Sequence, residues 1–165
     1  MDRMDQNMPF LLQYENVAWY DHGKVRILDR RVYPTEVRFV ECESYQDVVH
    51  AIADMVTQSA GPYTAVGMGM ALAAWQVRGE PKEKQITFLR QAAYDLAHAR
   101  PTTANRYGQI TFRAAELAEQ ALGELAQTSD TRQITPGGII RVVAEHYQVS
   151  PEDILSRKRS QEFVV

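Results

Sequence analysis

A change in hydrophobic period at Ser44 constrains the fold of this chain more than any other feature. Before it, short β-branched or alternating stretches at 17–20, 24–28 and 36–42 predict strands. The first two flank a turn at 21–23, whose glycine would permit the positive φ that a tight hairpin needs. After Ser44, apolar residues recur every three or four positions, which indicates helices. We therefore expect an α+β fold: a small three-stranded antiparallel N-terminal sheet packed on a mainly helical bundle.

Four helices are predicted after the strands. Ser44 and Asp47 have the spacing of a capping box, so the first helix begins there, and Gly61-Pro62 marks the break that follows it. The second helix, over 64–76, is rich in small residues that let neighbouring backbones approach closely, and we expect it to be the most buried. The third ends at Arg100-Pro101, and the fourth covers roughly 104–127.

Composition places limits on the rest of the molecule. The chain has 165 residues, a net charge of −3 and one cysteine, Cys42. These values exclude an internal disulfide framework and argue against a chain built as a whole to coat nucleic acid. The longest apolar run, 65–75, is short of the roughly 20 residues that span a bilayer. We expect a cytoplasmic protein without cofactor, metal or membrane partner, in which Cys42 is a buried, unreactive thiol.

A polar segment rich in Pro and Gly divides the chain into two parts. We predict a domain over 1–127, a linker over 128–138, and a C-terminal helical hairpin over 139–165. The hairpin ends in a basic cluster, Arg157-Lys158-Arg159.

Four segments follow one another in a characteristic order within residues 10–125: KVRILDRRVYPTEVRFVEC, DVVHAIADMV, AVGMGMALAAW and LRQAAYDLAHARPTTAN. In this order they resemble the N-terminal domain of the methylthioribose-1-phosphate isomerase family, which also includes the regulatory subunits of initiation factor 2B. The last segment is the most specific, because the family has an Arg-Pro-Thr-Ala-Val-Asn-type segment where this chain has Arg100 to Asn105.

The resemblance implies that four residues hold a sugar phosphate. In the family the arginine of this segment contacts the phosphate, which implies that role for Arg100, with Thr102 at the helix start that follows. The family's Arg-Gly-Ala-Pro loop corresponds to QSAGP at 58–62, which implies Ser59 and Ala60. Glutamine in the place of that loop's arginine removes a charge-assisted contact of about 1.5–3 kcal/mol.

Physical chemistry allows two readings of the Arg100 segment. A guanidinium offers a planar fork of donors to phosphate oxygens, and a helix start adds free N–H groups. The same residues also suit an ordinary junction, in which Arg100-Pro101 ends one helix and Thr102 or Thr103 caps the next. The two readings are compatible.

The chemistry of the family belongs to a larger C-terminal α/β domain, which supplies a catalytic cysteine and an aspartate. Nothing in 129–165 resembles either segment, and Cys42 matches a different cysteine of the family. The histidines, at 22, 50, 98 and 146, give no acid/base pair of the kind an aldose–ketose isomerase needs. We therefore predict no catalytic residue and no turnover by this chain alone, and a partner chain could supply the missing domain.

The tail resembles a different family. IIRVVAEHYQVSPEDILSRKRS, residues 139–160, is similar to the opening of the DNA-binding C-terminal domain of the replication initiator DnaA. That resemblance implies contacts of Arg157, Lys158 and Arg159 with the DNA backbone and minor groove. The family's recognition helix does not follow, so we expect only weak, salt-dependent DNA binding without base reading.

Three functional hypotheses stay open at this point. The chain is an isomerase-type module with a partial sugar-phosphate site, or a DNA- or protein-interaction module that works through its tail. The third is a fusion of two gene fragments without a selected function.

Overall fold

The structure, a computed structural model, describes residues 8–127, and the predicted linker and C-terminal hairpin lie outside that range. Two 3-10 turns come first, followed by three strands and four helices with a further 3-10 turn between the last two helices. The elements are η2 (Phe10–Leu12), η3 (Tyr14–Asn16), β1 (Ala18–Asp21), β2 (Lys24–Leu28), β3 (Phe39–Cys42), α1 (Tyr45–Ala53), α2 (Gly61–Val77), α3 (Lys82–Ala97), η4 (Pro101–Thr103) and α4 (Ala104–Gln127). The predicted α+β class is confirmed.

The strands form an antiparallel sheet in the order β1-β2-β3. Gly23 occupies the hairpin turn with φ +87°, as the sequence predicts. The third strand is shorter than expected, because it begins at Phe39 rather than at residue 36. Phe39 pairs with Leu28, the last residue of β2, so the residues before Phe39 have no strand beside them.

The start of α1 follows the predicted capping box. The Ser44 hydroxyl accepts a hydrogen bond from the Asp47 backbone N–H, and the Asp47 carboxylate accepts one from the Ser44 backbone N–H. The next helix departs from the prediction, since α2 begins at Gly61 instead of residue 64. Pro62 lies in its first turn, where a missing N–H costs no helical hydrogen bond. Gly61-Pro62 therefore starts a helix as well as separating two.

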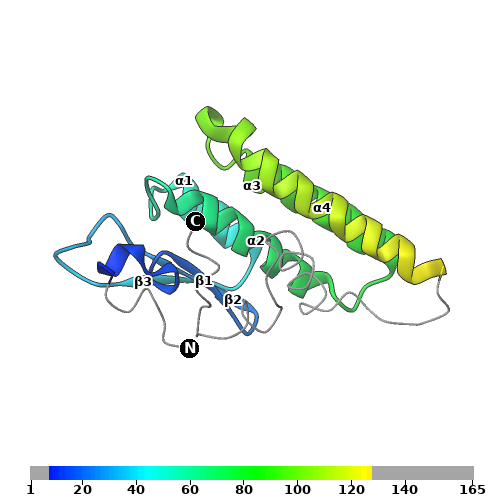
Figure 1. The fold of residues 1–165 in the computed structure, drawn as a ribbon, viewed down its shortest axis with the longest axis horizontal. Coiled ribbons are helices and arrows are strands. Elements are labelled where there is room, and N and C mark those ends of the chain that lie inside the picture. Colours follow the sequence, from blue (N-terminus) through cyan, green and yellow to red (C-terminus); the bar gives the residue numbers. More distant parts are fainter. Residues whose placement is uncertain (1–7, 128–165) are drawn as a thin grey trace.

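Helix α2 is the centre of the molecule. It contacts β1, β2, α1, α3 and α4, and Figure 1 shows the sheet on one side of it and the α3–α4 pair on the other. Ten of its seventeen residues are buried, a larger share than in α1 or α3. Its expected role as the most buried helix among these is confirmed.

Small residues on α2 allow this close packing at specific points. A Cβ added at Gly69 would lie 2.9 Å from Leu96 Cδ2 and 3.2 Å from Val48 Cγ1, so side chains from α3 and α1 both reach the Gly69 backbone. At Gly67 the nearest atom would be Ile110 Cγ2 at 3.9 Å, which is ordinary contact. Only Gly69 of these two is required by packing.

Cys42 is buried in β3 and is not part of a disulfide. Burial, with a smaller contribution from Asp47, raises the pKa of the thiol to about 12. The group is therefore a neutral core thiol at physiological pH. Within residues 8–127, no helix is long and apolar enough to cross a membrane.

Candidate anion-binding site

The segment after α3 carries Arg100, whose side chain reaches across to the loop between α1 and α2. Its Nε donates a hydrogen bond to the Ile52 carbonyl and its Nη2 donates one to the Thr57 carbonyl, each at 2.7 Å. The guanidinium thus joins the end of α1 to the α1–α2 loop. Among residues 8–127, no carboxylate forms an ion pair with it.

Arg100 leads directly into a 3-10 turn. Thr103 closes this turn with its backbone N–H on the Arg100 carbonyl at 3.2 Å, and its hydroxyl donates to the same oxygen at 3.4 Å. No side-chain hydrogen bond caps η4, which Pro101 begins without a backbone N–H. The predicted role of Thr102 or Thr103 as a cap concerned the helix that follows, α4, and stays a prediction. Thr102 is exposed beside Arg100.

A backbone hydrogen bond from the segment after β2 also holds the loop between α1 and α2. The Arg30 backbone N–H, just beyond β2, donates to the Val56 carbonyl at 2.7 Å. The loop also contains two residues with positive φ, Met55 at 60° and Ser59 at 57°. Hydrogen bonds on both sides therefore hold a backbone that most side chains disfavour.

The residue before Arg30 in sequence, Asp29, is a buried carboxylate. Asp29 has no exposed surface and accepts hydrogen bonds from Arg31 Nε at 2.8 Å, Arg31 Nη2 at 2.9 Å and Arg38 Nη2 at 2.9 Å. The hydrogen bonds from Arg31, with those from Arg38, hold the pKa of this carboxyl well below its usual range despite its burial. No sequence pattern predicted this cluster, because it depends on the turn that brings 29–31 beside residue 38.

The two predicted substrate segments lie side by side. Thr57, two residues before Ser59, accepts the bond from Arg100, so the loop and the Arg100 segment share one contact. Tyr63, in the first turn of α2, packs edge-on against Tyr107 in α4 with the ring centroids 5.4 Å apart. Figure 1 shows α2 and α4 beginning at the same end of the helical bundle.

The predicted site residues differ in how exposed they are and in the contacts they make. Ser59 and Ala60 are exposed and immediately precede α2, while Arg100 is half-buried. Gln58, which stands where the family has arginine, donates through its side-chain amide to the Met55 carbonyl at 3.2 Å. The amide thus bonds within its own loop and adds no charge.

Two contacts at this end of the bundle were absent from the sequence prediction, those of Tyr63 and Arg106. Arg106 follows Arg100 by six residues, and its interaction with Tyr63 raises the pKa of the guanidinium. The one sequence signal that could have pointed to Arg106 was its position shortly after the Arg-Pro-Thr segment. Arg157, Lys158, Arg159 and His146 lie outside the described residues.

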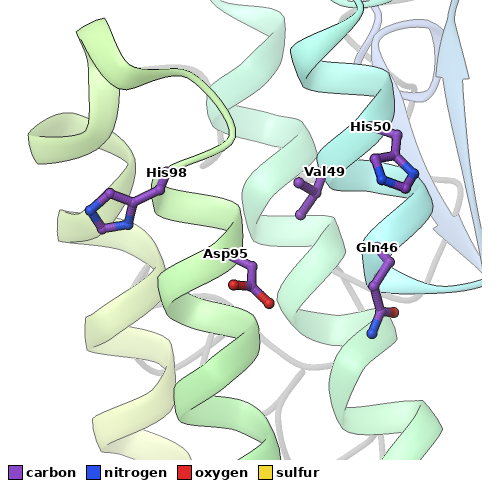
Figure 2. A pocket seen from close by; sticks show the side chains of 5 residues that line it. All are labelled: Gln46, Val49, His50, Asp95 and His98. Atoms are coloured by element: carbon purple, nitrogen blue, oxygen red, sulfur yellow. The ribbon is translucent and has the colours of Figure 1, made fainter.

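A separate shallow hollow of about 350 Å³ lies on the seam between α1 and α3. It is lined by Gln46, Val49, His50, Asp95 and His98. Figure 2 shows the Asp95 carboxylate and Val49 facing one another across the seam, whereas the His98 ring is turned away. The sequence placed the two histidines on separate helices but did not foresee a shared hollow.

Two side chains of this hollow, Asp95 and His98, make structural contacts. Asp95 accepts from the Tyr45 hydroxyl at 3.0 Å and from Gln91 Nε2 at 2.8 Å. His98 Nδ1 bonds to the Tyr94 carbonyl at 2.7 Å, and its ring stacks on that tyrosine. Burial, followed by the bond to Asp95, raises the pKa of Tyr45 to about 12. Residues 8–127 contain no cluster of three His, Cys, Asp or Glu suited to a metal.

No family model matches the chain, but individual proteins do. Methylthioribose-1-phosphate isomerase from Desulforudis audaxviator is 31% identical over 147 residues, which are 88% of this chain and 38% of that protein. The chain resembles methylthioribose-1-phosphate isomerases over most of its length. It spans between 24 and 40% of the length of the curated isomerases it matches. The resemblance stated from the sequence motifs is confirmed.

A solved structure shows the same fold. The 5-methylthioribose 1-phosphate isomerase from Pyrococcus horikoshii OT3 matches with a TM-score of 0.58 and 24% identity, covering 70% of this chain and 35% of that one. The chain is also similar to the chromosomal replication initiator protein DnaA 1 of Chlamydia trachomatis, with 34% identity over 92 residues. That match covers 51% of this chain, so it extends beyond the predicted hairpin at 139–165.

Proposed function

We propose that this chain is a sugar-phosphate-binding module of the methylthioribose-1-phosphate isomerase type. Its anion site consists of Arg100 and Thr102 on one side and the loop at Ser59 and Ala60 on the other. The observation that carries the proposal is the cation at position 100, whose charge no carboxylate neutralises within residues 8–127.

The two bonds of Arg100 leave part of its donor set for a ligand. A guanidinium has five N–H groups, and the backbone carbonyls of Ile52 and Thr57 take one from Nε and one from Nη2. Neutral carbonyls orient the group without cancelling its charge, which suits a site for an anionic ligand. A fixed guanidinium also loses less conformational freedom on binding than a free one.

We further propose that these 165 residues do not isomerise the sugar phosphate by themselves. Isomerisation moves a proton between neighbouring carbons and needs an acid/base pair within hydrogen-bond reach of the substrate. Cys42 is a buried neutral thiol, and Asp95 is held by Tyr45 and Gln91. The catalytic groups would come from another domain or partner chain.

Calorimetric titration of the full chain tests the binding proposal. Methylthioribose-1-phosphate is expected to bind, and its dephosphorylated sugar is expected to bind at least tenfold more weakly, because the site recognises the phosphate. Arg100→Gln should abolish binding, whereas Arg113→Gln, an exposed arginine on α4 paired with Glu116, should not change it. Equal binding of the two sugars, or none of either, would contradict the proposal.

A turnover assay tests the second part. The full chain incubated with methylthioribose-1-phosphate should give no ribulose product above the protein-free control. Product that increases in proportion to protein concentration would show that the acid/base groups are present after all.

The similarity to DnaA favours a second candidate, a DNA- or protein-interaction role through Arg157, Lys158 and Arg159. Filter binding of duplex DNA at low and physiological salt separates the candidates. Weak binding that disappears at physiological salt fits a solvated charge cluster. Sequence-selective binding that persists there would make DNA the ligand of this chain.

A further inference from the structure

Met55, in the loop between α1 and α2, is an exposed apolar residue in an unfavourable backbone conformation. It is 47% exposed, whereas Val56 and Thr57, which follow it, are buried. Its φ of 60° lies in the left-handed region, which few residues other than glycine, Asn and Asp adopt. Neither feature stabilises the fold, because the side chain keeps much of its apolar surface in water and the backbone conformation costs free energy. Strained residues of this kind gather at binding and catalytic sites, so a functional role is the first explanation to test.

Hydrogen bonds place Met55 beside Arg100. The Ile52 carbonyl accepts one bond from the Met55 backbone N–H at 3.3 Å and one from Arg100 Nε at 2.7 Å. The two donor nitrogen atoms therefore lie no farther apart than these two bonds together. The Met55 carbonyl in turn accepts from the Gln58 side-chain amide at 3.2 Å. Met55 and the guanidinium are thus fixed at neighbouring points of one loop.

An exposed apolar residue next to a fixed cation suits a ligand with two chemically different ends. The proposed ligand is a 5-methylthioribose 1-phosphate, so its charge is on carbon 1 of the sugar and its apolar methylthio group is on carbon 5. A methionine side chain is flexible and polarisable, and it adapts to apolar groups of irregular shape. Contact with the methylthio group would also remove apolar surface of Met55 from water.

We propose that Met55 is a specificity-determining residue of the Arg100 site, where it contacts the methylthio group of the ligand. The site then selects sugar phosphates with an apolar 5-substituent over those with a 5-hydroxyl. The inference rests on the proposed function. Arg100 binds the phosphate, which both kinds of ligand share, and Met55 distinguishes between them.

An ordinary surface methionine is the competing explanation, because single exposed apolar residues are common on proteins. Phe112 on α4 provides the comparison, since it is 43% exposed and no hydrogen bond joins its segment to Arg100 among residues 8–127. Alanine at either position removes an exposed apolar side chain of the same kind. Ligand selectivity should change with Met55 and not with Phe112.

Calorimetric titration of the full chain with methylthioribose-1-phosphate and with ribose 1-phosphate tests the inference. Wild type should bind the methylthio compound about tenfold more tightly, which is the size of a small apolar contact. Met55→Ala should reduce this preference to less than about threefold and leave the affinity for ribose 1-phosphate unchanged.

Three controls accompany this titration. Met55→Leu, which nearly conserves the side-chain volume, should keep most of the preference, and Phe112→Ala should keep all of it. Alanine and leucine both retain a Cβ, so neither variant at position 55 relieves the positive φ. Urea unfolding of each variant establishes that it is folded.

The outcomes separate the inference from the function on which it rests. Equal wild-type affinity for the two sugar phosphates would overturn the inference and keep the proposed function. A wild-type preference that Met55→Ala leaves intact would overturn it as well, because another residue would then determine selectivity. If Met55→Ala weakened both ligands equally, Met55 would have only a structural role beside Arg100. Absence of binding by wild type would overturn both the inference and the proposed function.

Discussion

Arg100 has a structural role that is compatible with the ligand-binding role proposed for it, as the sequence analysis allowed. It joins the junction to α1 and to the α1–α2 loop by donating to the carbonyls of Ile52 and Thr57, and no carboxylate within residues 8–127 pairs with its charge. Its Nε and Nη2 bonds are short, and one of the carbonyls belongs to a buried residue of α1. Position 100 should therefore matter to stability even without ligand.

Arg100→Ala is expected to lower the free energy of unfolding by about 2 kcal/mol, because two carbonyls lose a charged donor. Arg100→Lys should lose less, since an ammonium still donates to one of them. Urea denaturation without phosphate measures both. Arg113→Ala, which removes only an exposed pair with Glu116, should change stability by less than about 0.5 kcal/mol. An Arg100→Ala protein as stable as wild type would show that these two hydrogen bonds do not contribute to the free energy of unfolding.

Asp29 supplies a prediction of pH dependence. Its folded-state pKa is lower than its pKa in the unfolded chain, because Arg31 and Arg38 bind the carboxylate. Its stabilisation is therefore complete at neutral pH and is lost progressively as the pH falls below about 4 toward the folded-state value.

Asp29→Asn should reduce the free energy of unfolding at pH 7 by about 2–3 kcal/mol, since two arginines lose their buried partner. The same substitution should cost less at pH 2.5, because this carboxyl is then already protonated in the unfolded wild-type chain and part of its stabilisation is lost. Urea unfolding at the two pH values measures the difference. If Asp29→Asn lowered the free energy of unfolding equally at both pH values, the shape of the side chain rather than its charge would matter at this position.

At the scale of elements, the sequence patterns correctly predicted features that depend only on residues close together in the chain. The hairpin turn at Gly23, the capping box at Ser44 and the span of α4 follow from neighbours in sequence, and all are observed. The start of α2 was misplaced because Pro62 was read as a break only. The third strand was drawn too long because its length depends on where β2 ends, which is a long-range property.

Two glycines on α2 give a matched test of close packing. Gly69→Ala should destabilise the protein by about 1–3 kcal/mol, because its Cβ would press on the buried side chains of Leu96 and Val48. Gly67→Ala should be neutral or stabilise by about 0.5 kcal/mol through helix propensity, since its Cβ has room. Thermal unfolding of the two variants measures the contrast. Equal effects would mean that α2 does not pack as closely at Gly69 as described.

At the scale of the whole molecule, the candidate site depends on contacts between segments more than forty residues apart in sequence, as the bonds from Arg100 show. Resemblance to a family identified Arg100, Thr102, Ser59 and Ala60 as a set, which composition or periodicity could not do. It missed Tyr63, because the contact of this residue with Tyr107 exists only once α2 and α4 begin at the same end of the bundle. The Asp29 cluster was missed for the same reason.

The predicted division of the chain into two parts yields one more prediction. Deleting residues 131–165 should leave the free energy of unfolding of the remaining chain within about 0.5 kcal/mol of wild type, because residues 8–127 form a hydrophobic core packed around α2. The same deletion should remove any DNA binding. Chemical denaturation and filter binding of the truncated protein measure the two effects. A large loss of stability would show that the tail belongs to the same cooperative unit.

The most direct test of the central claim is a map of backbone amide chemical-shift changes as the full chain is titrated with methylthioribose-1-phosphate. The account predicts that the largest changes fall in two segments, 57–63 and 100–107, and that they saturate together. Changes centred on the hollow at His50 and Asp95 would contradict it, as would a spectrum that the sugar phosphate leaves unaltered.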